Sequence, residues 1–192
     1  MIPFEVNANR TEIRLAGEGG QGMILAGIIL AEAAAIYDGL QVVQSQSYGP
    51  EARGGASKSE VILSHSAIDF PKVIQADVVI ALSQEANDKY GNGLKENGIL
   101  IVDAVQVTQH VPANAIRLPI TRIARDTTGR EITTNTVALG ILVGLTGIVS
   151  LDAIRKAVRA RAPRGTGEMN LAALEAGFQA ARAYTLGETT SG

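Results

Sequence analysis

A glycine-rich turn at residues 17–22 constrains the fold of this chain more than any other stretch. Its sequence, Gly-Glu-Gly-Gly-Gln-Gly, lies between a short strand pattern over residues 12–16 and an alanine-rich helix pattern over residues 21–37. A strand that enters a helix through such a turn leaves backbone N–H groups unpaired at the helix start, beside the positive end of the helix dipole. Glycine permits φ > 0 and lets a ligand approach the backbone closely. The stretch therefore predicts a turn that can hold a phosphate.

The glycine pattern alone does not identify the ligand. Gly17, Gly19 and Gly22 have the spacing G-x-G-x-x-G of dinucleotide-binding turns, a pattern that is weak by itself. No acidic residue ends the second predicted strand to hold the ribose of NAD, and no Lys follows Gly22 as in a P-loop. The same glycines are also compatible with a tight turn that only permits close packing of a helix on a sheet.

The remaining hydrophobic pattern indicates an α/β fold. The apolar run 76–82, a helix over 84–95 and a second apolar strand at 98–103 form a right-handed βαβ unit. The connection after strand 41–47 is short enough for strand 57–64 to return antiparallel. Pro119 confines strand 116–120 to an edge or an end. Helical patterns follow at 121–126, at 135–148, after the N-cap Ser150 and from about residue 168.

We therefore expect one Rossmann-like α/β domain with a mixed, mostly parallel sheet flanked by helices and with C-terminal helices. It spans residues 12–184, between a flexible lead-in over residues 1–11 and a disordered tail over residues 185–192. Helix 21–37 is apolar almost all round, and helix 135–148 is rich in small apolar residues and contains several glycines. We expect such helices to pack against a neighbouring backbone or subunit, and the isolated chain to form a homodimer.

Composition excludes several classes of function. A net charge of −2, a pI near 5.7 and an aromatic content of 4% argue against nucleic-acid binding. Cysteine is absent, so the chain has no disulfide, no thiolate zinc site and no ligands for an iron–sulfur cluster. The first residues lack the features of a signal peptide, and no apolar run is long enough to span a membrane, so we expect a cytoplasmic protein. His65 and His110 are isolated, and we expect neither catalytic residues nor a metal site.

A second candidate site lies in the loop that follows strand 41–47. The loop contains one cation among small and polar neighbours, Arg53, which can bind a phosphate or a carboxylate through two hydrogen bonds. If strand 41–47 is parallel and adjacent to strand 12–16, this loop lies beside the glycine turn at the carboxyl edge of the sheet. An internal Glu51–Arg53 arrangement that only shapes the loop explains the same residues equally well.

Three stretches together resemble the gamma subunit, or gamma domain, of 2-oxoacid:ferredoxin oxidoreductases. They are Arg14 to Gly22, Gln44 to Gly55 and Asn135 to Gly140, and the resemblance covers residues 12–184. The forms Ile-Tyr-Asp-Gly at 36–39 and Ser-Tyr-Gly-Pro at 47–50 are most similar to the 2-oxoglutarate type. The resemblance implies oxidative decarboxylation of 2-oxoglutarate or pyruvate to the acyl-coenzyme A, with electrons passed to ferredoxin.

The resemblance also implies how the work is divided among subunits. Thiamine diphosphate and magnesium lie between the alpha and beta subunits, and iron–sulfur clusters lie on the beta chain or a small delta chain. The gamma module contributes to assembly and to part of the coenzyme A site, and it is inactive alone. The implied site residues are Gly17, Gly19, Gly20, Gln21 and Gly22 in the turn and Tyr48, Gly49, Glu51, Arg53 and Gly54 in the loop. The alternative is a free-standing nucleotide-binding or regulatory domain.

Overall fold

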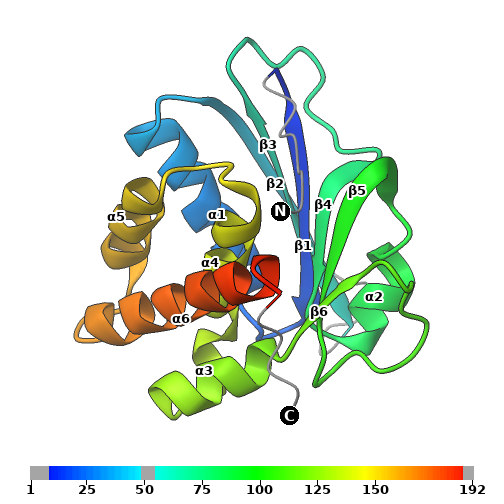
Figure 1. Cartoon of the computed structure of the whole chain (residues 1–192). Helices are drawn as coiled ribbons and strands as arrows, with labels where there is room; N and C mark the ends of the chain where they lie inside the picture. Colours follow the sequence, from blue (N-terminus) through cyan, green and yellow to red (C-terminus); the bar gives the residue numbers. More distant parts are fainter. Residues whose placement is uncertain (1–8, 49–54, 188–192) are drawn as a thin grey trace.

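A computed structural model describes residues 9–48 and 55–187 and contains one six-stranded sheet, in the order β2-β3-β1-β4-β5-β6 (Figure 1). The strands are β1 (Thr11–Glu18), β2 (Gln41–Ser47), β3 (Ala56–Ser64), β4 (Ala76–Ala81), β5 (Leu94–Asp103) and β6 (Ile116–Leu118). The α-helices are α1 (Met23–Glu32), α2 (Gln84–Tyr90), α3 (Ile120–Thr128), α4 (Thr134–Thr146), α5 (Leu151–Arg161) and α6 (Gly167–Thr185). A π-helical turn η1 (Ala33–Tyr37) extends α1, and a 3-10 turn η2 (Glu131–Thr133) precedes α4. The predicted fold class is confirmed.

The sheet is mixed because β3 alone runs against its neighbours. It pairs antiparallel with β2 and with β1, whereas β4 and β5 pair parallel with β1 and β4 respectively. The prediction that strand 41–47 returns into an antiparallel strand is thus confirmed. The second candidate site is placed beside the glycine turn on the assumption that strand 41–47 is adjacent to β1. That assumption is wrong, because β3 lies between the two strands. The physical reason is the short connection after β2, which permits an antiparallel return but no parallel crossover.

The helices cover the two sheet faces unequally, as Figure 1 shows. Helices α1, α3, α4, α5 and α6 lie on one face, and α2 lies on the other. The larger core joins alternate strand residues such as Leu15 and Ile80 to the five helices, and a smaller core beneath α2 contains Val79 and Ala86. The alternation along β1 and β4 therefore separates two apolar layers, as expected for strands covered on both sides.

Several element boundaries differ from the prediction for local reasons. The helix expected over 84–95 ends at Tyr90 because glycines follow at 91 and 93, and β5 then begins at Leu94. Strand β1 begins at Thr11, one residue before the expected start. Ser150 caps α5 as predicted, by accepting a hydrogen bond from Ala153 N. The lead-in and the tail stay predictions, since residues 1–8 and 188–192 lie outside the described residues.

The glycines of α4 serve packing within the chain and not a subunit contact. A Cβ added to Gly140 would lie 2.0 Å from Leu174 O of α6, and one added to Gly177 of α6 would lie 2.1 Å from Val137 O. Every residue from Thr134 to Val143 is buried. The neighbouring backbone that small residues admit is therefore α6, so the idea that this helix supplies surface for a subunit is wrong. The apolar surface of α4 is covered within the chain because α6 packs across it (Figure 1).

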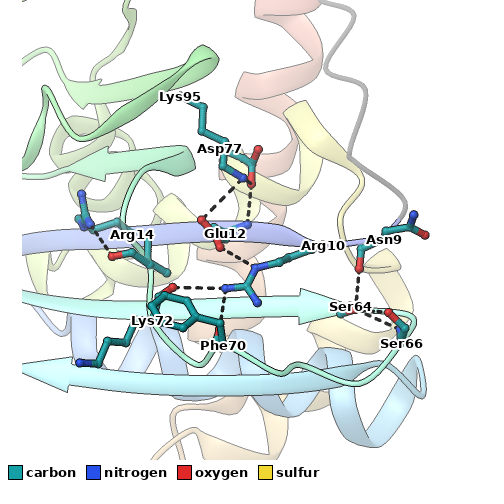
Figure 2. A network of polar contacts seen from close by, with 11 residues as sticks. Asn9, Arg10, Glu12, Arg14, Ser64, Ser66, Phe70, Lys72, Asp77 and Lys95 are labelled. Atoms are coloured by element: carbon teal, nitrogen blue, oxygen red, sulfur yellow. Dashed lines mark hydrogen bonds and ion pairs between the residues drawn. The ribbon is translucent and has the colours of Figure 1, made fainter.

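A charged network covers the α2 side of the sheet near the start of β1 (Figure 2). Asp77 accepts hydrogen bonds from Glu12 N at 2.7 Å and from Lys95 Nζ at 2.8 Å, and Arg10 Nε lies 2.6 Å from Glu12 Oε1. Further along β1, Arg14 Nε lies 2.8 Å from Glu60 Oε1. These pairs replace an apolar layer on this part of the sheet. In residues 9–48 and 55–187, no helix has the length and apolar character that a membrane crossing needs.

Candidate functional site

The glycine turn joins β1 to α1 through two left-handed residues. Gly20 has φ +96° and Gly22, the N-cap of α1, has φ +75°. No side chain of the described residues caps α1, and its first turn contains no acidic residue. The N–H groups of that turn, at the positive end of the helix dipole, are therefore left for solvent or an anion.

The glycines of this turn fall into two physical classes. A Cβ on Gly17 would lie 2.5 Å from Gln21 Oε1, and one on Gly22 would lie 2.6 Å from Asn135 Nδ2. A Cβ on Gly19 or Gly20 would meet nothing within 4 Å. Gly17 and Gly22 are thus required by packing inside the protein. No atom of the described residues approaches Gly19 or Gly20, so within this part of the chain their backbone is open to a ligand.

Gln21 stabilises the turn from within. Its Oε1 accepts a hydrogen bond from Glu18 N at 2.7 Å, and its Nε2 donates to Leu82 O at 3.2 Å. The amide thus links the carboxyl ends of β1 and β4. Both of its polar groups are engaged within the chain, so the geometry gives Gln21 a role in shaping the turn.

A chain of hydrogen bonds joins the glycine turn to the C-terminal helices. Asn135 Nδ2 donates to Gly22 O over 3.2 Å. The neighbouring Thr136 Oγ1 donates to Asn170 Oδ1 over 3.1 Å, and Asn170 Nδ2 donates to Thr166 O over 3.0 Å. The starts of α1, α4 and α6 are therefore tied together. Asn135 and Thr136 belong to a stretch that carries the family resemblance, yet they are not among the predicted site residues.

These tied helix starts border a cavity of about 300 Å³. Gly20 and Gly22 form one side, and apolar side chains that include Ile29, Val158 and Met169 contribute to the rest. Arg161 on its lining is paired with Glu32, which raises the pKa of the guanidinium. Arg130, also on the lining, is exposed and forms no ion pair with any residue that the structure describes. The cavity thus combines an apolar wall, the glycine turn and a free cation.

The second predicted site is the loop between β2 and β3, of which the structure describes only the two ends. Tyr48 follows β2 and is exposed, while Gly49, Glu51, Arg53 and Gly54 lie outside the described residues. On the far side of the loop, Ala56 pairs with Glu18, the last residue of β1. The start of β3 therefore lies beside the glycine turn, although β2 is one strand further away.

Comparison with known proteins gives the class to which this fold and site belong. Residues 12–180 match the family described as pyruvate ferredoxin/flavodoxin oxidoreductase, and the chain belongs to this family. It is 50% identical to the 2-oxoglutarate synthase subunit KorC of Methanocaldococcus jannaschii, over 90% of this chain and 95% of that one. The predicted resemblance is thereby confirmed.

Solved structures identify the particular subunit. The gamma subunit of a keto/oxoacid ferredoxin oxidoreductase from Geobacter sulfurreducens superimposes with a TM-score of 0.83, at 52% identity over 92% of this chain and 98% of that one. The chain is accordingly a gamma-type subunit of an oxoacid:ferredoxin oxidoreductase. A 2-oxoglutarate:ferredoxin oxidoreductase of Magnetococcus marinus, solved with 2-oxoglutarate, coenzyme A and succinyl-CoA bound, shares the fold at 24% identity. Its TM-score is 0.80, over 91% of this chain and 31% of that one. The alternative of a free-standing regulatory domain is not favoured.

Proposed function

We propose that this subunit serves a 2-oxoglutarate-oxidising enzyme and that its glycine turn forms part of the coenzyme A site. The observation that carries the proposal is that no described residue covers Gly19 and Gly20 or caps the start of α1 with its side chain. Coenzyme A carries a pyrophosphate and a further phosphate on its adenosine, groups that suit the backbone N–H donors of a helix start. The preference for 2-oxoglutarate over pyruvate is supported by the high identity to the KorC subunit.

The cavity beside the turn supports the same proposal. Its apolar wall suits the less polar parts of coenzyme A, and the guanidinium of Arg130, which forms no ion pair with a described residue, suits a phosphate. Arg53, in the loop outside the described residues, is proposed as a second cation for this ligand. Replacing it with Ala should weaken coenzyme A binding by roughly 1.5–3 kcal/mol, the worth of a charge-assisted hydrogen bond, or about one to two decades in the Michaelis constant.

The partner subunits are proposed to supply the redox chemistry. Alpha and beta subunits, and a delta subunit where the clusters lie on a separate chain, would hold thiamine diphosphate, magnesium and the iron–sulfur clusters and pass electrons to ferredoxin. This chain has no cysteine with which to bind a cluster. The pure chain should therefore show no turnover of 2-oxoacids with coenzyme A, thiamine diphosphate and a viologen acceptor. Co-purification from native extract should recover the partner chains, and fractionation should place the complex in the cytoplasm.

A glycine substitution tests the coenzyme A site most directly. Gly19→Leu places a side chain in the open space without a clash and without a left-handed φ. The free energy of unfolding should change by less than about 0.5 kcal/mol. In the reconstituted enzyme, the Michaelis constant for coenzyme A should rise at least about tenfold, the equivalent of 1.4 kcal/mol. Decarboxylation of 2-oxoglutarate without coenzyme A should be unchanged.

The control is Asn114→Leu, which adds the same side chain at an exposed position before β6 that does not line the cavity. It should leave the Michaelis constant for coenzyme A unchanged. An assembled Gly19→Leu enzyme with normal coenzyme A kinetics would exclude the turn from the coenzyme A site. Comparison of 2-oxoglutarate with pyruvate in the same assay decides the substrate.

A further inference from the structure

The two edges of the sheet are protected to very different degrees. The β6 edge is three residues long, carries Arg117 at its centre and is followed by Pro119. The β2 edge is seven residues long and reads Gln-Val-Val-Gln-Ser-Gln-Ser, with no charge and no proline. Natural edge strands usually avoid pairing with other chains through short length, charges, prolines or bulges. β6 has three of these features, and β2 lacks all of them.

The backbone of β2 is also regular enough to accept another strand. It pairs with β3 at every position from Gln41↔Ser64 to Ser47↔Lys58, without a register shift. On its other side β2 has no strand among the described residues. One row of its backbone N–H and C=O groups is thus available for a further antiparallel ladder.

We propose that a second copy of this chain pairs antiparallel with β2 and that the two sheets form one continuous sheet. Centred on Gln44, a two-fold pairing sets Val42 opposite Gln46 and Val43 opposite Ser45. No like charges face each other in this arrangement, because the strand has no charges. The same patch on both copies forms the interface, as a two-fold dimer requires.

Apolar side chains at the two ends of β2 complete the interface. Ile36 and Tyr37, just before the strand, are 67% and 40% exposed, and Tyr48, just after it, is 69% exposed. Antiparallel pairing brings the end of one copy's strand to the start of the other's. In the register centred on Gln44, Tyr48 of each copy lies opposite Leu40 of the other, and Ile36 and Tyr37 precede that position in the chain. Burial of these side chains adds apolar contact that a backbone ladder by itself lacks.

One strand separates the β2 ladder of this interface from the glycine turn of the proposed coenzyme A site. β3 lies between β2 and β1, the strand that leads into the glycine turn. The dimer also makes no use of α4, whose apolar surface is covered inside the chain. Tyr48 belongs both to this interface and to the residues that the family resemblance implies for the coenzyme A site, whereas the β2 ladder itself includes none of those residues.

The absence of cysteine provides a clean test by crosslinking. In Gln44→Cys the two introduced thiols lie across the two-fold, with Cα atoms about 4.5–5.5 Å apart, within the range of a disulfide. Mild oxidation of the full chain should give mostly covalent dimer. In the matched variant Gln41→Cys the two thiols lie six residues apart along the ladder, roughly 20 Å, and should not crosslink. Equal crosslinking of both variants would overturn the proposal.

Charge substitutions give a second test that does not depend on oxidation. Light scattering at ~10–100 μM should show a dimer for the unaltered chain and a monomer for Gln44→Lys and for Gln44→Glu, because each places like charges opposite each other. A mixture of the two variants should recover a dimer. Arg117→Glu on the β6 edge should remain dimeric, and circular dichroism checks that every variant is folded.

Three results would overturn the proposal. The first is a monomeric unaltered chain, and the second is a Gln44→Lys chain that remains dimeric. The third is a reconstituted complex in which a different subunit crosslinks to position 44 and the gamma copies do not meet.

Discussion

Asn135 and Gly22 are 113 residues apart in the chain and fit together at the start of α1. Asn135 Nδ2 donates to Gly22 O over 3.2 Å, and a Cβ on Gly22 would lie 2.6 Å from the same nitrogen. The contact requires glycine at position 22 for two reasons, the positive φ and the space that the amide occupies. It fixes the glycine turn against α4, so the geometry of the candidate ligand site depends on a helix from the second half of the chain.

Replacement of Asn135 by Ala should loosen the turn. The change removes the hydrogen bond to Gly22 O and the one that Asn135 Oδ1 accepts from Thr136 N. We expect the free energy of unfolding to fall by about 1–3 kcal/mol, as for other buried polar pairs, together with weaker coenzyme A binding in the assembled enzyme. Urea unfolding measures the first effect. Asn92→Ala, at an exposed position, is the control and should change the stability by less than about 0.5 kcal/mol.

Gly140→Ala should be among the most destabilising single substitutions in the chain. The added Cβ would lie 2.0 Å from Leu174 O, a backbone atom that cannot move without separating α4 from α6. We expect a loss of more than about 3 kcal/mol or failure to fold. Gly167→Ala meets no neighbour and should be neutral or slightly stabilising. Similar melting temperatures for the two variants would show that α4 and α6 do not pack as described.

Glu60→Ala should lower the free energy of unfolding, because it leaves the buried guanidinium of Arg14 without its ion-pair partner. The Arg14 side chain is only 7% exposed and its Nε lies 2.8 Å from Glu60 Oε1. Removing the carboxylate leaves the guanidinium buried without its partner, which should cost about 3 kcal/mol in the free energy of unfolding. Glu168→Ala removes a partner of Arg159 from an exposed pair and should cost less than about 0.5 kcal/mol. Equal effects in urea unfolding would contradict this account.

Asp103 should make the stability fall with rising pH. Burial raises the pKa of Asp103, although hydrogen bonds from Thr121 and Val105 oppose part of this effect. Between the ordinary pKa of an aspartate and the raised one, the native state holds a proton that the unfolded state releases, so the free energy of unfolding decreases as the pH increases. Asp103→Asn cannot release a proton, and its unfolding curve should lack this decrease.

Urea unfolding of both proteins at a series of pH values, from about 3 upward, isolates the contribution of this side chain. The difference between the two free energies removes the effect of the other titrating groups. A difference that instead shows the aspartate protein gaining stability with pH would mean that the three hydrogen bonds outweigh the burial.

The sequence by itself determined the local elements. Strand 41–47 has the predicted bounds, Ser150 caps α5, and Pro119 follows the short edge strand β6. These features depend on residues that are neighbours in the chain, on periodicity, capping and the restricted φ of proline. The glycine turn was recognisable for the same reason, and the combination of three short stretches was enough to indicate the family.

Only the tertiary structure decided which elements meet. It inserted β3 between β2 and β1, used the α4 glycines for contact with α6, and tied Gly22 to Asn135. It also divided the glycines of the turn into those that packing requires, Gly17 and Gly22, and those that face open space, Gly19 and Gly20. The local pattern of the turn is the same for both classes. The difference lies in which atoms from distant segments approach each glycine, and that depends on how the whole chain packs.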